Sequence, residues 1–417
     1  MQKTSATTTV TEAFYQPLRQ ALPAAEHLWF CPELPDDEWV RMGVERVLEA
    51  SPSGRAFLQE HGPRFEKIPT TCNYFAALRS ERRLDLIREL AGNVVATIEP
   101  RLADRLADIP ELAGYDCFAG DGHWHRGAIH DPRHEDAKVA VGHFYRLNLR
   151  THTLVHLTTG QGLHEHDMSA LKRVQPKGLR QGVPRGTRVL LVYDKAGIDL
   201  KFWHRCRREC AIYFVSRLKE NMVMEWVADG PLDRKDARSR GVLDDWKVRS
   251  RDGQLLRVVT YQEPVSGEVF EFLTNQLDLP SGVIVELHRR RWEVEKVFDE
   301  LKNKLGQTRA WGTSLVAREV QAQMIALTHN LLLNYEQELE DRHQVNNEPE
   351  DRRRVQRSEA MRRQCARERM PVSQLLLLGR RATQRGVKFI RWLRQSLRDR
   401  LAEALAVVRL KALYARL

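Results

Sequence analysis

Through most of the first 110 residues, apolar residues recur every three or four positions, the spacing of amphipathic helices. The clearest stretches are 37–50 (DEWVRMGVERVLEA) and 80–107 (SERRLDLIRELAGNVVATIEPRLADRLA). Proline and glycine mark the breaks between such stretches. We therefore expect residues 1–110 to form a helical N-terminal domain, serving either as a DNA reader or only for packing.

The pattern changes near Tyr115, where short apolar runs alternate with turn signals and helical stretches. We expect strands at 115–120, 141–150, 152–160, 188–193 and 211–218, with helices at 164–174 and 197–210. Three neighbouring strands followed by alternating helices and strands indicate an α/β fold. Residues 111–220 are therefore compatible with the first part of a ribonuclease-H-like core.

The second half of the chain alternates between β-rich and helical patterns. Residues 221–281 have a β-rich, irregular pattern, with strands expected at 254–262 and 268–275. One long helix is expected from about 281 to 305, within a segment, 282–312, that completes the core. Residues 313–417 are expected to be helical, and the charged stretch 342–354 is the expected linker.

Charge is distributed unevenly along the chain. The net charge is +11, and residues 351–417 carry 19 Lys and Arg against 5 Asp and Glu, so this tail alone carries +14. A basic segment on a near-neutral body suits a polyanion partner, because neutralising phosphates releases counterions. A solvated, Arg-rich helical surface is the alternative explanation.

Membrane and secretory features are absent from the pattern. No run reaches the roughly 18 apolar residues that span a bilayer, and the N-terminus has no apolar leader core. We therefore expect a cytoplasmic protein that does not enter a membrane. Its cysteines are sparse and irregularly spaced and are expected to be reduced: Cys31, Cys72, Cys117, Cys206, Cys210 and Cys365.

Three carboxylates stand out by their placement. Asp121 follows the first strand within AGDGHWH, Asp194 follows the run RVLLVY, and Glu295 lies in the long helix. Carboxylates at strand ends and on a facing helix are suited to hard divalent cations such as Mg²⁺. Taken singly, an Asp after a strand is commonly a turn former or helix cap, and a Glu in a charged helix is usually solvated.

The helix segment HRRRWEVEKVFDELKNKL (288–305) arranges its polar residues on one side. His288, Arg291, Glu295 and Lys302 are separated by three, four and seven residues, which places them on one broad face. Trp292 and Phe298 lie on the other flanks and are expected to pack the helix onto the sheet.

These residues carry a resemblance to a known family. The helix resembles the Y-x2-R-x3-E-x6-K signature of the insertion-sequence-four family of bacterial DDE transposases, with His288 in place of the Tyr. FLTNQLDLP (272–280), YFVSRLKEN (213–221) and DGHW (121–124) resemble further segments of that family, in the same order. The resemblance covers roughly residues 115–311.

The resemblance implies a function and a metal centre. Asp121, Asp194 and Glu295 would form the DDE triad and bind two Mg²⁺ ions, for which Mn²⁺ would substitute. The reaction would be cut-and-paste transposition, in which water nicks each element end and the freed 3′-hydroxyl then joins target DNA. Residues 221–281 would be the family's β-rich insertion between the second and third acids.

Partners follow from the same resemblance. Double-stranded DNA, as element ends and target, would be the substrate of a homodimer in the bacterial cytoplasm, associated with the nucleoid when bound. The apolar register at 401–417 suits a dimer interface or ordinary core packing.

Six further residues are expected to contact DNA. Arg291 and Lys302 would bind phosphates near the cleaved bond, with intrahelical pairing to Glu295 as the alternative for both. His288 would donate a hydrogen bond in place of the Tyr, and Lys219 with Arg217 would contact the backbone. Trp311 is expected either to stack on an unpaired base or to be buried.

Other interpretations stay open. Asp116, Asp199 and Glu293 rank below the triad as catalytic acids. His123-x-His125, His164-x-His166 and His204-x-Cys206-x3-Cys210 give only a weak zinc pattern, since no second Cys-x2-Cys half exists. The alternatives in function are a ribonuclease-H-like nuclease without strand transfer, and an inactivated transposase that represses by binding DNA.

Overall fold

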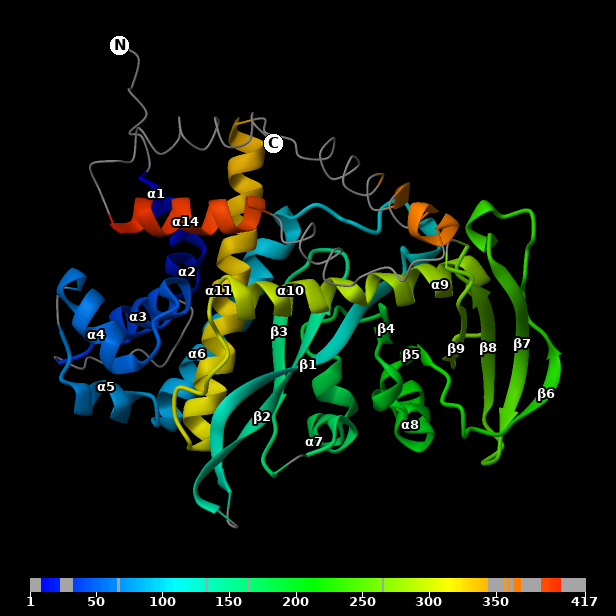
Figure 1. Ribbon diagram of the computed structural model, residues 1–417, viewed down its shortest axis with the longest axis horizontal. Coiled ribbons are helices and arrows are strands. Elements are labelled where there is room, and N and C mark those ends of the chain that lie inside the picture. Colours follow the sequence, from blue (N-terminus) through cyan, green and yellow to red (C-terminus); the bar gives the residue numbers. More distant parts are fainter. Residues whose placement is uncertain are drawn as a thin grey trace.

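The computed structural model (Figure 1) describes most of the chain from residue 9 onward. The described residues are 9–22, 33–65, 68–131, 134–163, 165–264, 266–343, 356, 359–360, 363–368 and 384–398. The expected interface at 401–417, and the expected linker at 342–354 beyond its first two residues, lie outside them.

The N-terminal region is helical, as predicted. Its helices are α1 (Val10–Phe14), α2 (Gln16–Ala21), α3 (Asp36–Glu49), α4 (Gly54–His61), α5 (Thr71–Ala77) and α6 (Glu81–Ile98). Ser80 caps α6 by accepting a hydrogen bond from the Arg83 amide. The predicted helix 80–107 is too long, because Pro100 follows within a short 3₁₀ turn and has no amide hydrogen to continue the helix.

A nine-stranded mixed sheet forms the centre of the molecule and confirms the predicted α/β class. Its order is β3-β2-β1-β4-β5-β9-β8-β7-β6. The strands are β1 (Tyr115–Asp131), β2 (His134–Asn148), β3 (Leu154–Thr159), β4 (Arg188–Val192), β5 (Ile212–Arg217), β6 (Met224–Asp229), β7 (Val242–Ser250), β8 (Leu255–Gln262) and β9 (Val269–Thr274).

The type of strand pairing changes twice across the sheet, from antiparallel to parallel and back to antiparallel. Strands β1, β2 and β3 are antiparallel, whereas β4 and β5 run parallel to β1. The β-rich segment then continues the same sheet, because β9 pairs antiparallel with β5 and β6–β8 follow as a meander. Beyond the two strands predicted in this segment, the structure adds β6 and β7.

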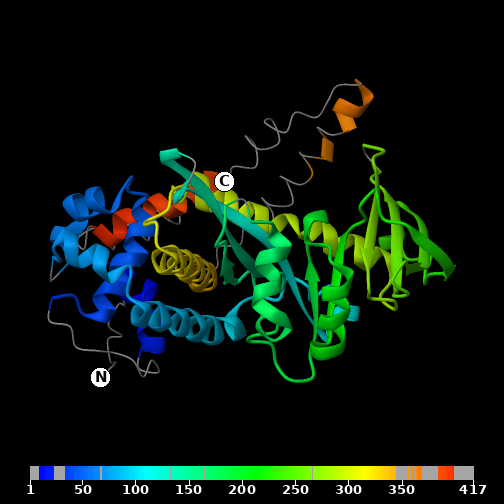
Figure 2. The same ribbon diagram turned by 90° about the horizontal axis from the view of Figure 1, so that it is seen from below.

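Helices cover both faces of the first five strands (Figures 1 and 2). On one face, α7 (Asp167–Leu179) and α8 (Leu200–Cys210) bury Phe118, Leu171 and Trp203. On the other, α9 (Ser281–Arg290), α10 (Trp292–Asn303) and α11 (Leu315–His343) share one core with the N-terminal helices. Helix α14 (Gln384–Arg398) returns to pack against α1 and α3.

The predicted long helix at 281–305 is divided into α9 and α10 at Arg291. The Arg291 amide still donates to the carbonyls of Leu287 and His288, so the chain keeps its direction through the break. Phe298 is buried against the sheet as expected, but Trp292 is 48% exposed. The expectation that Trp292 packs the helix onto the sheet was therefore wrong.

A buried ion pair joins the start of α9 to the strands β7 and β8. Arg257 donates to both carboxylate oxygens of Asp245, at 2.8 and 2.5 Å, and both side chains are fully buried. Arg257 also donates to the Leu279 carbonyl, and the Ser281 hydroxyl donates to Asp245. The β-rich segment is thus held to the helix pair that carries the expected catalytic glutamate.

The described part of the chain contains five cysteines, and none of them forms a disulfide there. Within the described residues, we find no helix with the length and apolar character that crossing a bilayer requires.

Four histidines form a buried array between the sheet and α10. His123 and His125 alternate with outward residues on β1, His143 lies opposite on β2, and His156 lies on β3. Their rings follow one another at 4.7, 4.4 and 6.1 Å. Burial lowers the pKa of His123 to about 4 and of His156 to about 3, and it lowers the pKa values of His125 and His143 well below the usual value of a histidine.

The array predicts sensitivity to acid. Since the folded pKa values lie below the unfolded value near 6.5, only the unfolded chain takes up these protons as the pH falls below 6.5. Each histidine then removes about 1.4 kcal/mol of stability per pH unit. We expect His125→Phe to flatten the decline of unfolding free energy between pH 6.5 and 5, measured by denaturant titration.

His204→Phe is the control for this prediction, because His204 is exposed on α8. Its slope should equal that of the unaltered protein. Equal slopes for His125→Phe and the unaltered protein would contradict the assignment of His125 as a neutral, buried group.

Candidate active site

The candidate site lies where β1 and β4 separate. Their parallel pairing ends at Ala119 and Val192, and the ring of Tyr193 then lies over Gly120. A Cβ atom at Gly120 would be only 1.9 Å from that ring, so the close approach requires glycine. Beyond this point β2 is the only strand that pairs with β1, and a crevice opens at the carboxyl end of β4, where α/β sheets typically bind ligands.

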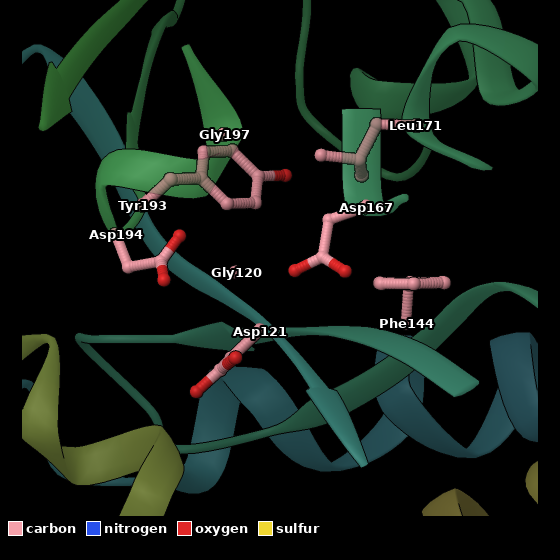
Figure 3. A pocket seen from close by; sticks show the side chains of 8 residues that line it. All are labelled: Gly120, Asp121, Phe144, Asp167, Leu171, Tyr193, Asp194 and Gly197. Carbon is pink, nitrogen blue, oxygen red and sulfur yellow. The ribbon is translucent and has the colours of Figure 1, made fainter. Parts of the chain in front are cut away.

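A small pocket, partly open to solvent, lies in this crevice (Figure 3). Asp121 and Asp194 both line it, from β1 and from the turn after β4. The remaining lining residues are Gly120, Phe144, Asp167, Leu171, Tyr193 and Gly197. The structure thus brings together the two aspartates that the sequence places after separate strands.

Local hydrogen bonds hold Asp194 at the end of its strand. Its carboxylate accepts a hydrogen bond from the Ala196 amide at 2.9 Å, as the cap of a short 3₁₀ turn. The Ser216 hydroxyl on β5 donates to the Asp194 carbonyl at 2.7 Å. The turn therefore keeps the carboxylate directed at the pocket, as Figure 3 shows.

Arg291 joins the third acid to the first. Its guanidinium lies 2.7 Å from the Glu295 carboxylate, one helical turn away, and 3.7 Å from that of Asp121. The Arg291 side chain is only 9% exposed, against 25% for Asp121 and 32% for Glu295. A single cationic side chain therefore bridges acids from α10 and β1.

Burial raises the pKa of Asp121 to about 6, and the charges of the Glu295 and Asp194 carboxylates add to this rise. The Gly122 amide, which donates to Asp121 at 2.7 Å, and the Arg291 charge act in the opposite direction. Asp194 and Glu295 therefore both lie close enough to Asp121 to act on it electrostatically.

The donor chemistry at this site fits a divalent cation. Carboxylate oxygens are the hard ligands that Mg²⁺ and Mn²⁺ prefer. Among the described side chains, no three His, Cys, Asp or Glu residues are close enough to hold one metal ion. In the described arrangement Arg291 supplies the positive charge that Asp121 and Glu295 require.

Asp167 is a site residue that the sequence reasoning missed. It begins α7, lies half-buried, and lines the pocket beside Asp194. Burial, and after it the charge of Asp194, raise the pKa of Asp167. The available signal was an aspartate at the start of a helix that follows the third strand, HEHDMSALKRV, but that position is also common for a residue that only starts a helix.

Comparisons with known proteins give this geometry a context. Residues 133–331 match the family model described as "Transposase DDE domain". The chain carries a transposase DDE domain. The match spans just under half of the chain and includes Asp194 and Glu295. It begins after Asp121, but the strand that carries Asp121, β1, pairs with β2, which lies within the matched residues.

No match was found among the curated proteins. Among solved structures, the chain resembles one described as a cryo-EM structure of the piggyBac transposase synaptic complex with hairpin DNA, with 12% identity and a TM-score of 0.37, covering 98% of this chain and 83% of that one. The expectation of a DDE transposase enzyme is confirmed by the family match, and such enzymes generally use divalent metal ions.

The lysines and arginines expected to contact DNA are either accessible to solvent or paired with other side chains of the transposase domain. Lys302 is exposed on α10, seven residues after Glu295, and Lys219 is half-exposed after β5. Arg217 lies at the end of β5 with its guanidinium 4.8 Å from the centre of the Phe270 ring. Arg291, in contrast, shows the intrahelical pairing that the sequence left as its alternative.

His288 does not face solvent. It is 6% exposed, its ring lies against Phe272 at 4.5 Å, and burial lowers its pKa to about 3. A neutral, buried imidazole in this position does not present a hydrogen-bond donor at the surface. The expected phosphate contact of His288 therefore has no counterpart in the described arrangement.

Trp311 is buried in the transposase domain, which is the packing alternative stated for it. Its side chain is 8% exposed, and the Arg46 guanidinium lies 4.1 Å from its ring centre. The helical N-terminal region thus covers the indole face that base stacking requires.

The other acids considered from the sequence, and the histidines of the weak zinc patterns, make contacts outside the candidate site. Asp199 caps α8 and pairs with Lys172 at 2.5 Å, and Glu293 pairs with Lys296. His123 and His125 belong to the buried array, and no metal-binding group including them was found in the described part of the chain. His164 lies outside the described residues.

The Arg291 bridge predicts competition with metal. Arg291→Gln removes a unit charge beside the carboxylates, and such a charge repels a divalent ion roughly 5 Å away by about 1.7 kcal/mol in a water-like dielectric. We expect about tenfold tighter Mn²⁺ binding to the metal-free protein, measured by calorimetry at pH 8, where Asp121 is ionised.

Arg289→Gln is the matched control, because Arg289 is 62% exposed on the neighbouring helix turn and its nearest acid, Glu286, is 3.9 Å away. Mn²⁺ affinity should change little in this variant. Unchanged or weaker binding in Arg291→Gln would show that Arg291 does not compete with the metal.

Proposed function

We propose that the protein is a cut-and-paste DNA transposase of the insertion-sequence-four type. Asp121, Asp194 and Glu295 are its catalytic triad. One observation carries the proposal: carboxylates from β1, from the end of β4 and from α10 converge at one edge of the sheet, in a chain with a DDE domain match.

The proposal includes a ribonuclease-H-like core. Its support is the order β3-β2-β1-β4-β5, in which three antiparallel strands are followed by two parallel strands, with helices on both faces. Strands β6–β9 correspond to the proposed β-rich insertion between Asp194 and Glu295. The fold by itself would not decide the chemistry, because one fold hosts many reactions.

The triad residues would hold divalent cations, Mg²⁺ or Mn²⁺. When bound, these ions supply Lewis-acid activation of the attacking and leaving oxygens. Asp121 must lose its proton to serve as a ligand, and its pKa of about 6 means that this happens just below neutral pH. The Ala196 and Gly122 amides orient the carboxylates of Asp194 and Asp121 before any substrate arrives.

The residues around the triad position the DNA. In the first step a water oxygen bonds to phosphorus at an element end, and the 3′-oxygen leaves with a proton. The new 3′-hydroxyl then attacks a second phosphodiester in the same way.

Once other charges compensate Asp121 and Glu295, Arg291 is free to bind a phosphate through two hydrogen bonds. Lys302, Lys219 and Arg217 extend this phosphate contact along the crevice.

Double-stranded DNA is the proposed partner, as element ends and as target. Two ends must be held together for transposition, so we propose a homodimer in the active complex. The charge of +14 in residues 351–417 suits additional backbone contacts. His288 and Trp311 are not included in the proposed DNA surface, because both are buried.

Glu295→Gln tests the catalytic assignment. The amide keeps the size of the side chain but loses the charge that a metal ligand needs, so metal-dependent cleavage of DNA carrying the element ends should fall by at least about a thousandfold, a barrier increase of roughly 4 kcal/mol. End binding in a gel-shift assay should be retained.

Glu293→Gln is the matched control, since it makes the same change two residues away, where Glu293 pairs with Lys296. Its cleavage rate should stay within about threefold, because exposed ion pairs contribute little. Metal-dependent nicking retained by Glu295→Gln would refute the triad.

A nuclease and a transposase differ in the second step. A nuclease without strand transfer cuts the element end but does not use the 3′-hydroxyl as a nucleophile. We expect the protein to join a pre-cleaved 3′ end to plasmid DNA, measured as a labelled covalent product on a denaturing gel.

The third alternative, an inactivated transposase that represses by binding DNA, would show end binding with neither cleavage nor joining. Cleavage without joining would instead favour the nuclease. The convergence of the three carboxylates argues against the repressor, because DNA affinity alone has no use for negative charges packed together.

A further inference from the structure

The outer half of β1 carries an exposed face that continues from the candidate site. Beyond Ala119 the strand no longer pairs with β4, and the hairpin of β1 and β2 extends past the ends of β3 and β4 (Figure 1). Side chains alternate between the two faces of a strand, so Gly120, which lines the pocket, shares one face with Trp124 and Arg126. At about 3.4 Å per residue, Trp124 lies about 14 Å and Arg126 about 20 Å along the strand from Gly120.

Two arginines lie side by side at the outer end of this face. Arg126 and Arg309 are partners in a parallel β-bridge. The Arg126 amide donates to the Thr308 carbonyl, and its carbonyl accepts from the Ala310 amide, both at 2.9 Å. Bridge partners point to the same side, and neighbouring strands are only about 4.8 Å apart. Two exposed guanidinium groups therefore project together from segments that are joined through their backbones.

The charges of this arginine pair are not compensated within the described part of the chain. Among the described residues, no salt bridge joins Arg126 or Arg309 to an Asp or Glu, whereas Arg290 pairs with Glu286 at 2.8 Å. Like charges at directly opposed strand positions destabilise a sheet. A bound anion would offset this cost, and the planar fork of a guanidinium group matches the oxygens of a phosphate.

An exposed tryptophan lies between the arginine pair and the pocket. Trp124 is 40% exposed, although burial of a large apolar ring is stabilising. Its ring lies against the backbone of β2, because a Cβ atom at Gly142 would be 3.3 Å from two of the ring atoms. The same Cβ atom would be 3.2 Å from the ring of Phe144, which lines the pocket. No side chain at Gly142 therefore separates the indole from the wall of the pocket.

We propose that Trp124, Arg126 and Arg309 form a binding surface for the DNA duplex next to the bond that reacts. Each arginine holds one of two neighbouring phosphates, and Trp124 packs against the DNA between them and the pocket. Phosphates of one strand follow one another at about 3.4 Å along the duplex axis, so the arginines bind about six nucleotides from the reacting bond. This inference rests on the proposed function, because it assumes that DNA is the substrate at the pocket.

The salt dependence of DNA binding tests this surface. The affinity of the full chain for a linear duplex is measured by fluorescence anisotropy at several NaCl concentrations, in EDTA so that no metal-dependent cleavage occurs. Each phosphate contact contributes about 0.9 to the slope of log affinity against log salt. Arg126→Gln and Arg309→Gln should each reduce that slope by about 0.9, which is about an eightfold loss of affinity at 0.1 M salt relative to 1 M. Trp124→Ala removes no charge, so it should weaken binding at every salt concentration and leave the slope unchanged.

Arg208→Gln is the matched control, because Arg208 is exposed near the end of α8, at the end of β4 that lies away from the pocket. Its slope and affinity should equal those of the unaltered protein, and Arg126→Lys, which keeps the charge, should retain the slope. An unchanged slope in either folded arginine-to-glutamine variant, or an equal change in Arg208→Gln, would overturn the inference. If the unaltered protein binds and cleaves DNA while those variants keep its slope, the proposed function stands and the inference fails. If it binds no DNA, both fail.

Discussion

The architecture of this site depends on the burial of one carboxylate, Asp121, beside the acids Asp194 and Glu295 and the cation Arg291. Burial raises the pKa of Asp121 to about 6, and the charges of Glu295 and Asp194 add smaller contributions to this rise. Such a cluster needs a compensating cation. Arg291 provides it by bridging Asp121 and Glu295 at 3.7 and 2.7 Å.

The crevice beside these acids forms because two neighbouring strands of the sheet, β1 and β4, stop pairing at this point. Strands β1 and β4 pair in parallel up to Ala119 and Val192, and the Tyr193 ring then takes the space above Gly120. Beyond this point β2 is the only strand that pairs with β1. The sheet therefore opens here, between the hydrophobic cores on its two faces. At this opening Asp167, which lies on a helix of the face opposite to α10, lines the same pocket as Asp121 and Asp194.

Distant parts of the chain position the helix that carries Glu295. The fully buried pair of Arg257 and Asp245 holds the start of α9 to β7 and β8, and breaking such a pair typically costs about 3–5 kcal/mol. At the other end, the Gln307 carbonyl after α10 is hydrogen-bonded to the His123 ring on β1 at 2.8 Å. The helix is therefore fixed to the β-rich segment and to the first strand, so movement of either would alter the distance between the acids.

Local pattern was enough to predict much of the fold and to single out three acids as the proposed catalytic triad. The periodicity near Tyr115 predicted β1, β4 and β5 to within a few residues at their N-terminal ends, since burial of one face or both is written in consecutive residues. The order of strands and short motifs also pointed to Asp121, Asp194 and Glu295. It did not predict the length of β1 and β2, because their outer halves are stabilised by pairing with each other rather than by an apolar run.

Only the tertiary structure determines which side chains are exposed and which charged side chains lie next to one another. The helix pattern placed His288, Arg291 and Lys302 on one face. In the structure His288 is buried against Phe272, and Arg291 pairs with Asp121. Of the three, only Lys302 is exposed to solvent. Trp311 is covered by Arg46 from the N-terminal region, and Asp167 enters the site from another helix. Sequence spacing determines neighbours along one element, but contacts between elements depend on how the sheet opens and how helices pack upon it.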